Sequence, residues 1–417
     1  MAREPDEQCD VAIVGGGPAG LALASRLKRA GLDRVVVLER EAQAGGVPRH
    51  CGHYPFGYHE YGLPMRGPDY ARRRVDDAIR AGVDLRTGVT VTDLLEGGRL
   101  GICTDAGTAT LPARRVAVCT GTRESSRAQR FIAGTRPQGV ISTGALQSFV
   151  YLEQMMPFRR PVILGTELVS FSALLTCRHA GIRPVAMIEP QSRITARAFC
   201  RSLPAVMRVP LHLNTRICRI LGDRQVEGIE VETGRDGRRV IEADGLICTG
   251  QFRPESALMR NGHLSVDPGT GGPVVDQYAR ASDPAYFCAG NLLRPVETHA
   301  WCAQEGDRTA AMIVEDLERD APAGAAADTP IVAAHPSIRY VMPQRLSADS
   351  GGTTMQHLQI RLADPARGRL VARADGRTVW SKRIDALPER RLLAPLAALL
   401  PHRGAKSIEI GLEEANL

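Results

Sequence analysis

The sequence predicts an α/β protein with two Rossmann-like dinucleotide-binding domains and a small β-rich domain at the C-terminus. A pattern of strand, glycine turn, helix, strand and acid occurs at residues 10–39, and an altered copy occurs at 160–190. After residue 330, short runs alternate between apolar and polar residues, which is typical of strands. With 417 residues the chain is long enough for two or three hydrophobic cores.

The first pattern, DVAIVGGGPAGLALASRLKRAGLDRVVVLE, has every part of a dinucleotide site. Its glycines allow a tight turn, close approach of a pyrophosphate and close helix–strand packing, and the helix N-terminus faces the phosphates. Glu39 ends the second strand, where its carboxylate can bond both ribose hydroxyls. A glycine signature alone is weak evidence, but the complete series at this spacing predicts a bound dinucleotide. The residues predicted to contact it are Gly15, Gly17, Pro18, Ala19, Gly20, Glu39, Arg40 and Gly46.

Three segments resemble the FAD-binding segments of the two-dinucleotide-domain flavoproteins. These are GGGPAG near the N-terminus, RVAVCTGTRE at 115–124 and GPVVDQYARASDPAYFCAGNL at 272–292. In that family the last segment usually ends in Gly-Asp, whereas here it ends in Gly-Asn, which can hydrogen-bond but carries no charge. The long amphipathic helix that follows points its N-terminus at the flavin in the family, where the helix dipole favours a reduced, anionic ring. The resemblance therefore implies FAD, with further contacts from Thr120, Gly121, Gly290, Asn291 and Thr298.

The second pattern, RPVILGTELVSFSALLTCRHAGIRPVAMIEP, has a broken glycine signature. Gly165 keeps the first position, but Glu167 and Ser170 replace the second and third glycines. A carboxylate at the second position would repel a pyrophosphate by its charge and exclude it by its bulk. Glu189 nevertheless ends the following strand, as a ribose-binding acid would. The resemblance implies an inserted domain for NAD(P)H. Three readings stay open for this site: NAD(P)H, another adenine nucleotide, or an empty site with a structural role.

The segment GGVPRHCGHYPFGYHEYG, residues 45–62, contains three histidines and Cys51. A redox dithiol is disfavoured because the nearest cysteines in the sequence are Cys9 and Cys103. A metal site is disfavoured because no second ligand cluster completes the histidine set, so we predict none. We expect instead a glycine-rich loop beside the flavin ring, which makes His50, Cys51 and His53 the candidates for groups acting on the flavin; no other catalytic residue is identified.

The composition excludes several classes of function. The net charge of +7 is spread along the chain and aromatic residues make up 4%, which argues against nucleic-acid binding. No apolar run reaches the roughly 18 residues that a membrane span needs. The ten cysteines contain no CxxC pair, which indicates a reduced, cytoplasmic protein.

The expected domains are a discontinuous FAD domain at 8–125 and 252–320, a second Rossmann-like domain at 126–251, and the β-rich domain at 331–417. The linker DAPAGAAADTP precedes the last of these. Strands are expected at HLQIRLA, GRLVARADG, RTVWSKRID and KSIEIGLEE, with a hairpin at Asp375-Gly376 and a short helix at LLAPLAALL. This domain has no cofactor motif, so we expect a docking or structural module.

A finer resemblance rests on GGVPRHCGHYPFG, GPDYARR, GNLLRPVETHAWCAQEG and SIRYVMPQR. These segments are similar to flavoprotein subunits encoded beside glycerol-3-phosphate-dehydrogenase-like proteins and, more distantly, to subunits of opine and amino-acid dehydrogenase complexes. The likeness covers about residues 10–345. It implies an FAD-dependent oxidoreductase that transfers electrons within a hetero-oligomeric complex acting on a small-molecule substrate, with a dehydrogenase subunit and a small Cys-containing subunit as partners. The alternatives are a free-standing NAD(P)H-dependent flavin reductase and a non-catalytic subunit with structural nucleotide sites.

Overall fold

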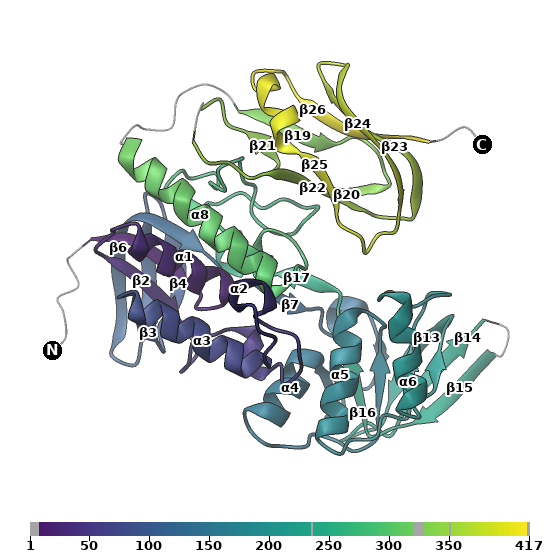
Figure 1. Cartoon of the computed structure of the whole chain (residues 1–417). Helices are drawn as coiled ribbons and strands as arrows, with labels where there is room; N and C mark the ends of the chain where they lie inside the picture. Colours follow the sequence, from purple (N-terminus) through teal and green to yellow (C-terminus); the bar gives the residue numbers. More distant parts are fainter. Residues whose placement is uncertain (1–7, 235–236, 320–327, 350–351, 415–417) are drawn as a thin grey trace. The chain divides into compact units, whose positions relative to one another are not determined.

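The computed structural model describes residues 8–234, 237–319, 328–349 and 352–414 (Figure 1). The chain forms two compact units. The first unit comprises Met1–Gly46, Ala71–Thr122 and Arg253–Leu417, and the second comprises Val47–Tyr70 and Arg123–Phe252. The chain therefore enters the second unit twice, at Val47 and at Arg123, and returns to the first unit each time.

The first unit is built on a seven-stranded sheet in the order β3–β2–β1–β6–β5–β4, with β18 paired to β6. Strands β1, β2, β3 and β18 and the second half of β6 run parallel. Strand β5 pairs antiparallel with the first half of β6, and β4 pairs antiparallel with β5. The bounds are β1 Cys9–Val14, β2 Val35–Glu39, β3 Asp84–Thr87, β4 Thr90–Leu95, β5 Arg99–Thr104, β6 Gly107–Val118 and β18 Tyr286–Cys288.

The core of the first unit lies on both faces of this sheet. Along β1, Val11 and Ile13 enter one buried cluster, while Ala12 and Val14 enter the other. This alternation follows from the strand geometry, in which successive side chains point to opposite faces. Both faces are apolar because the parallel strands are covered on both sides, which explains why the sequence of β1 reads as a continuous apolar run.

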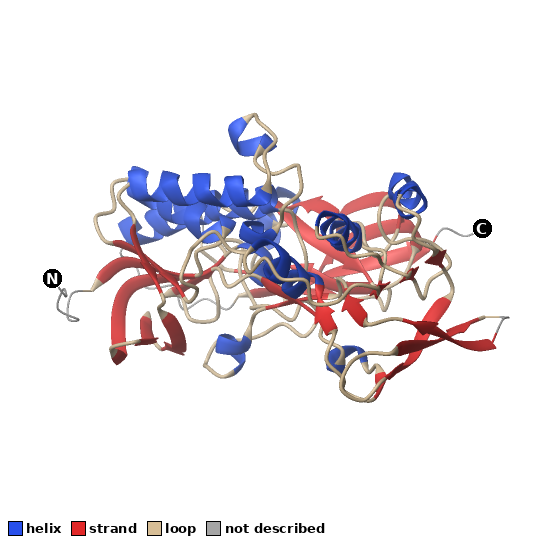
Figure 2. Cartoon of the chain, turned by 90° about the horizontal axis from the view of Figure 1, so that it is seen from below, coloured by secondary structure: helices blue, strands red, loops and turns tan. Residues whose placement is uncertain are grey.

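Helices α1 (Pro18–Arg29) and α8 (His299–Arg319) run side by side in the first unit, as Figures 1 and 2 show. Their backbones approach closely because Gly306 of α8 has no side chain, and a β-carbon there would overlap the Ala19 carbonyl oxygen of α1. The other helices at or near this unit are α3 (Gly67–Arg80), which begins in the second unit, and α7 (Ala257–Arg260).

The second unit repeats the α/β plan on a parallel sheet in the order β12–β11–β10–β16–β9. Beside it lies an antiparallel sheet in the order β15–β14–β13, to which β8 adds in parallel. The strands are β8 Ala133–Gly134, β9 Val140–Ser142, β10 Pro161–Leu164, β11 Ala186–Ile188, β12 Leu211–His212, β13 Thr215–Leu221, β14 Gly228–Thr233, β15 Gly237–Glu242 and β16 Gly245–Cys248. The helices are α2 Tyr58–Tyr61, α4 Thr143–Tyr151, α5 Leu168–His179 and α6 Ser202–Val206. The short strands β7 Thr122–Glu124 and β17 Phe252–Pro254 span the points where the chain passes between units.

The C-terminal segment forms two sheets, β21–β19–β26–β23–β24 and β20–β22–β25. Their bounds are β19 Thr329–Ala333, β20 Ile338–Met342, β21 Arg345–Leu346, β22 His357–Leu362, β23 Ala366–Ala374, β24 Arg377–Ala386, β25 Leu392–Pro395 and β26 Ile408–Glu414. The four expected strands form here, and both residues of the turn between β23 and β24 have positive φ, as a tight two-residue hairpin requires.

The expected helix at LLAPLAALL is wrong. Leu392–Pro395 is strand β25, which pairs with β22, and two short 3₁₀ turns follow it. Pro395 explains the difference, because a proline disfavours helical backbone in the residue before it and cannot donate a helical hydrogen bond.

The compact units also differ from the expected domain boundaries at two places. Residues 47–70 belong to the second unit instead of the first, and the C-terminal strands belong to the first unit. The assignment of these parts as FAD, NAD(P)-type and β-rich domains remains a prediction. Within the described residues, no helix combines the length and apolar character that a membrane crossing would need.

Candidate functional site

The turn between β1 and α1 depends on glycine at two positions. Gly15 has a φ of +108°, and a β-carbon there would lie 2.6 Å from the Cys119 carbonyl oxygen. A β-carbon at Gly20 would overlap the Gly15 carbonyl oxygen, so this residue sets how closely the helix can follow the strand. In contrast, a β-carbon at Gly17 would meet only Gly46 Cα, at 3.9 Å, so the surface beside Gly17 is open.

The Glu39 carboxylate closes the same turn from the end of β2. It is 8% exposed, and its oxygens accept one backbone N–H each, from Gly16 at 2.9 Å and from Glu41 at 2.9 Å. A carboxylate oxygen can accept a second hydrogen bond, so Glu39 can still bind hydroxyl donors. The neighbouring Arg40 is exposed and lies 3.5 Å from the Glu41 carboxylate.

Two later segments of the first unit meet the start of α1. Strand β18 pairs parallel with β6, and Gly290 follows β18. A β-carbon at Gly290 would lie 2.8 Å from Ala19 Cβ of α1. In the other segment, the Thr120 hydroxyl donates to the Glu255 carbonyl oxygen at 2.8 Å, and the Glu255 amide donates to the Gly121 carbonyl oxygen at 2.9 Å. The predicted contacts therefore come together from three distant parts of the sequence.

Asn291 stabilises its own loop. Its side-chain amide donates to the Glu297 carbonyl oxygen at 3.1 Å and its side-chain oxygen accepts from the Glu297 amide at 2.7 Å. These two bonds close the loop that leads to Thr298 and α8. An aspartate could accept from the Glu297 amide but could not donate to its carbonyl oxygen, which gives a structural reason for asparagine at this position.

The residues of the first turn fit a dinucleotide such as FAD. Pro18 opens α1, its first turn contains no acidic residue, and its N-cap Gly17 makes no side-chain capping bond. The backbone N–H groups of that turn can therefore bind a phosphate, which the helix dipole also favours. A side chain at Gly17 would fill this space, and Glu39 provides acceptors for ribose hydroxyls.

His50, Cys51 and His53 lie together in the second unit. The Cys51 thiol is 3.5 Å from the side-chain oxygen of Gln147, and burial raises the pKa of this thiol to about 12. The ring of His50 lies beside Gly144, whose added β-carbon would be 3.9 Å from His50 Cε1. The Nδ1 atom of His53 is 2.9 Å from the Tyr54 carbonyl oxygen. In the described ranges, no three His, Cys, Asp or Glu side chains are arranged to bind a metal ion.

All ten cysteines lie in the described residues and are free thiols. Burial raises the pKa of Cys119, Cys177 and Cys302 to about 12 and that of Cys248 to about 11. Thiolates are the reactive form of cysteine, so these side chains are poor nucleophiles at neutral pH.

The second turn, between β10 and α5, has the same backbone but different side chains. Gly165 has a φ of +114°, close to that of Gly15. The Thr166 hydroxyl donates to the buried Glu189 carboxylate at 2.5 Å, and so takes the place of the Gly16 amide in the first turn.

Glu167 occupies in the second turn the position that Gly17 occupies in the first. Its carboxylate accepts from the Gln251 amide at 2.8 Å and packs against Gly250, where any β-carbon would overlap it. Burial raises the pKa of Glu167, and the negative charges of Glu124 and Glu189 act in the same direction. The Arg130 guanidinium favours the ionised form, and it also donates to the Gly250 carbonyl oxygen at 2.7 Å.

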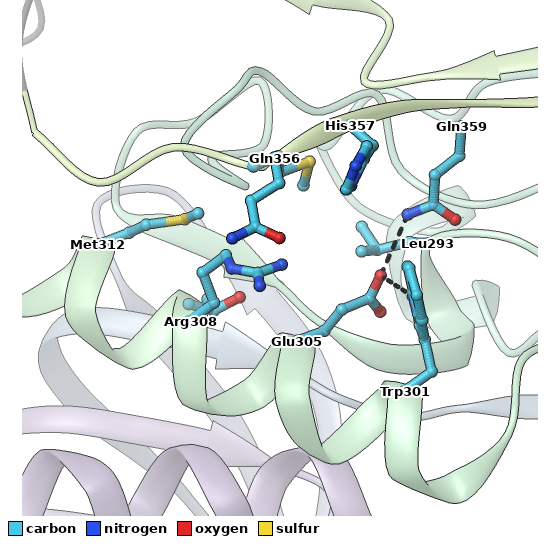
Figure 3. Close-up of a pocket in the computed structure, with 10 residues that line it drawn as sticks. Leu293, Trp301, Glu305, Arg308, Met312, Gln356, His357 and Gln359 are labelled. Carbon is cyan, nitrogen blue, oxygen red and sulfur yellow. Dashed lines mark hydrogen bonds between the residues drawn. The ribbon is translucent and has the colours of Figure 1, made fainter. Parts of the chain in front are cut away.

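A small pocket lies between α8 and the start of β22 (Figure 3). Trp301, Glu305 and Arg308 line it from α8, and His357 and Gln359 line it from β22. The segment GNLLRPVETHAWCAQEG contains Trp301 and Glu305, but its sequence did not predict a pocket. The spacing of 301, 305 and 308 places these residues on one face of a helix, but only the folded chain shows which strand covers that face.

The two strand–turn–helix units, each closed by an acid at the end of the next strand, define an oxidoreductase with two dinucleotide folds. The chain belongs to the pyridine nucleotide-disulphide oxidoreductase family, whose model matches residues 9–306. The family and its thioredoxin reductase members use FAD and NAD(P)H, and this chain is an FAD-dependent oxidoreductase of that family.

Individual relatives extend this result. Thioredoxin reductase of Listeria monocytogenes is 25% identical over 343 residues, which cover 78% of this chain and 100% of that protein. Sarcosine oxidase subunit alpha of Rhizobium meliloti is 26% identical over 340 residues, or 75% of this chain and 31% of that longer protein. The glutamate synthase (NADPH) small chain of Mycobacterium tuberculosis is 43% identical over 81 residues, and this chain spans only 14% of its length. The solved thioredoxin reductase of T. acidophilum shares the fold, with a TM-score of 0.62 and 22% identity over 75% of this chain and 100% of that one.

We predict that Gly17→Glu abolishes FAD binding, because the new carboxylate would enter the space open to the pyrophosphate. At a few ångströms the charge repulsion alone costs about 1–4 kcal/mol, equivalent to a roughly five- to thousandfold loss of affinity, and the bulk of the side chain adds to this loss. The variant should fold, since Gly17 has an extended backbone that any residue adopts. FAD titration followed by flavin fluorescence measures the effect, and Gly17→Gln separates bulk from charge. Wild-type affinity in Gly17→Glu would contradict this assignment.

We also predict that Cys51 forms no redox disulfide, because its thiol contacts Gln147 and is buried. Titration of the denatured protein should find ten thiols, whether or not the native protein was first reduced anaerobically. An increase from eight to ten thiols upon reduction, lost in Cys51→Ser, would show that Cys51 has a disulfide partner.

Proposed function

We propose that this chain is the electron-transferring FAD subunit of a hetero-oligomeric dehydrogenase, in which a partner subunit oxidises a small-molecule substrate. The open first turn, the blocked second turn and the ten unpaired thiols support this assignment. Sarcosine oxidase subunit alpha, by its name, is also one subunit of a larger enzyme. A small Cys-containing subunit is a second partner in this proposal.

In this proposal FAD lies in the first unit and, when bound, accepts and donates the electrons. The amides at the start of α1 bind its pyrophosphate, and Glu39 accepts the hydroxyls of its ribose. Gly121, Gly290 and the N-terminus of α8 after Thr298 bind the rest of the cofactor. His50, Cys51 and His53 remain candidates, from the sequence alone, for groups that act on the flavin.

The Glu167 carboxylate is the observation that carries the proposal. In a site that binds NAD(P)H, the second glycine lets the pyrophosphate approach the backbone. Here Glu167 takes that position, and its carboxylate is fixed by the Gln251 amide against Gly250. NAD(P)H would have to displace this carboxylate and overcome its charge. A chain that binds NAD(P)H poorly needs another electron donor, which a partner dehydrogenase would supply.

A second candidate is a free-standing NAD(P)H-dependent reductase. The match to the full length of a thioredoxin reductase favours it, as do the retained Gly165 and Glu189 of the second turn. It requires the Glu167 side chain to move away, or to bind a ribose of the incoming nucleotide. A non-catalytic subunit is the third alternative, and only the altered second turn supports it.

NADH titration of the FAD-loaded protein under anaerobic conditions tests these alternatives. We predict slow and incomplete flavin bleaching in the wild type, and NADH binding about five- to a thousandfold tighter in Glu167→Gly, since the variant removes both bulk and charge. Glu167→Gln is the matched control that retains the bulk, and it should recover only the part of the affinity that is due to charge. Micromolar NADH affinity with rapid bleaching in the wild type would refute the subunit proposal and favour the free-standing reductase.

A further inference from the structure

Arg294 is the largest fully buried side chain of the described residues, and it lies in the loop between Gly290 and α8. Its guanidinium donates three hydrogen bonds within the first unit. One goes to the Gly290 carbonyl oxygen at 2.8 Å, one to the Glu305 carboxylate at 2.5 Å, and one to the Gln359 side-chain oxygen at 3.0 Å. Arg294 thus joins the Gly290 turn to α8 and to β22 of the C-terminal segment.

A single carboxylate oxygen of Glu305 accepts three hydrogen bonds, and Figure 3 shows those from Trp301 and Gln359. Besides Arg294, it accepts from the Trp301 indole N–H at 2.8 Å and from the Gln359 side-chain amide at 3.2 Å. Gln359 therefore uses both ends of its amide, one toward Arg294 and one toward Glu305. Because Arg294 is fully buried, removing one of its partners leaves its guanidinium with an unsatisfied hydrogen-bond donor.

The C-terminal segment holds the same loop at a second place. The Glu297 carboxylate accepts from Arg391 and lies 3.5 Å from the Arg361 guanidinium. Arg391 also stacks on the Trp301 ring, 3.6 Å from its centroid. The Tyr340 hydroxyl donates to the Pro295 carbonyl oxygen at 3.2 Å. Three parts of the C-terminal segment therefore contact the loop from Gly290 to Thr298: β20, β22 and the residue before β25.

We propose that Arg294 and Gln359 are positioning residues through which the C-terminal segment sets the geometry of the flavin-binding loop. The inference rests on the proposed FAD site, since Gly290, Asn291 and Thr298 are its predicted contacts on this loop. It assigns the C-terminal segment a role in tuning the bound flavin, where the sequence suggested only a docking or structural module.

A second contact between α8 and the C-terminal segment makes it possible to test whether Arg294 and Gln359 only attach this segment. Glu315 accepts from the Thr353 amide and hydroxyl, both at 2.6 Å. Glu315 lies ten residues beyond Glu305 and therefore about 15 Å further along α8. Its loss weakens the attachment of the C-terminal segment without touching the Gly290 loop, so Glu315→Gln is a matched control.

The experiment compares full-length wild type, Arg294→Met, Gln359→Leu and Glu315→Gln, each titrated with FAD and monitored by flavin fluorescence. The visible circular dichroism and the midpoint potential of the bound flavin are then measured on the FAD-loaded fraction. We expect the Kd for FAD to rise at least tenfold in Arg294→Met and Gln359→Leu, with altered circular dichroism and a shifted potential. Glu315→Gln should stay within twofold of wild type and keep its spectrum and potential.

Two outcomes would overturn the inference while leaving the proposed function intact. In one, Arg294→Met and Gln359→Leu keep the wild-type Kd, spectrum and potential. In the other, all three variants change equally, which would indicate general loosening of the C-terminal segment. If Arg294→Met does not fold, Gln359→Leu decides the question. A wild-type chain that binds no FAD would refute the proposed FAD site, and the inference with it.

Discussion

The first unit depends on the close approach of backbone to backbone at the start of α1. Gly20 contacts the Gly15 carbonyl, Gly306 lets α8 reach the Ala19 carbonyl, and Gly290 packs against the Ala19 side chain. Segments from both ends of the unit meet at this point, and none of them leaves room for a larger residue. Beside Gly17, in contrast, a β-carbon would meet only Gly46 Cα, so the surface at the start of α1 stays open there. The proposed phosphate site lies at this open surface, next to the packing that holds the unit together.

The two nucleotide turns show how one backbone can serve two purposes. Gly15 and Gly165 adopt nearly the same φ, and in both turns an acid at the end of the next strand receives a bond from the turn. The difference lies in Gly17 and Glu167, which occupy equivalent positions. Glycine leaves the surface beside the turn open, whereas the glutamate carboxylate bonds the Gln251 amide and packs against Gly250. In our proposal this single side chain changes the binding properties of the turn while the fold around it is retained.

The sequence predicted best the features that depend on neighbouring residues. The pattern at 10–39 matches β1, α1 and β2 closely, and the strands around Asp375-Gly376 follow from alternation and turn chemistry. The sequence predicted a helix at LLAPLAALL, but Leu392–Pro395 forms strand β25. Pairing with β22 and the proline at 395 favour a strand there, although the apolar composition suits a helix. The burial and hydrogen bonds of Arg294 could not be predicted, for a different reason. Its partner Gln359 is 65 residues away, and nothing local distinguishes a buried arginine from an exposed one.

The position of β18 has a consequence for the order in which the chain can fold during synthesis. The sheet of the first unit is interrupted after β6, and β18, which covers the open side of β6, is made only after the whole of residues 123–252. Until then the apolar second half of β6 has an unpaired edge, which is the kind of surface that promotes aggregation. The second unit is complete earlier, since all its strands precede residue 253. During synthesis the second unit can therefore fold completely while the first unit still lacks β18 and α8. A chaperone would be most useful at this stage.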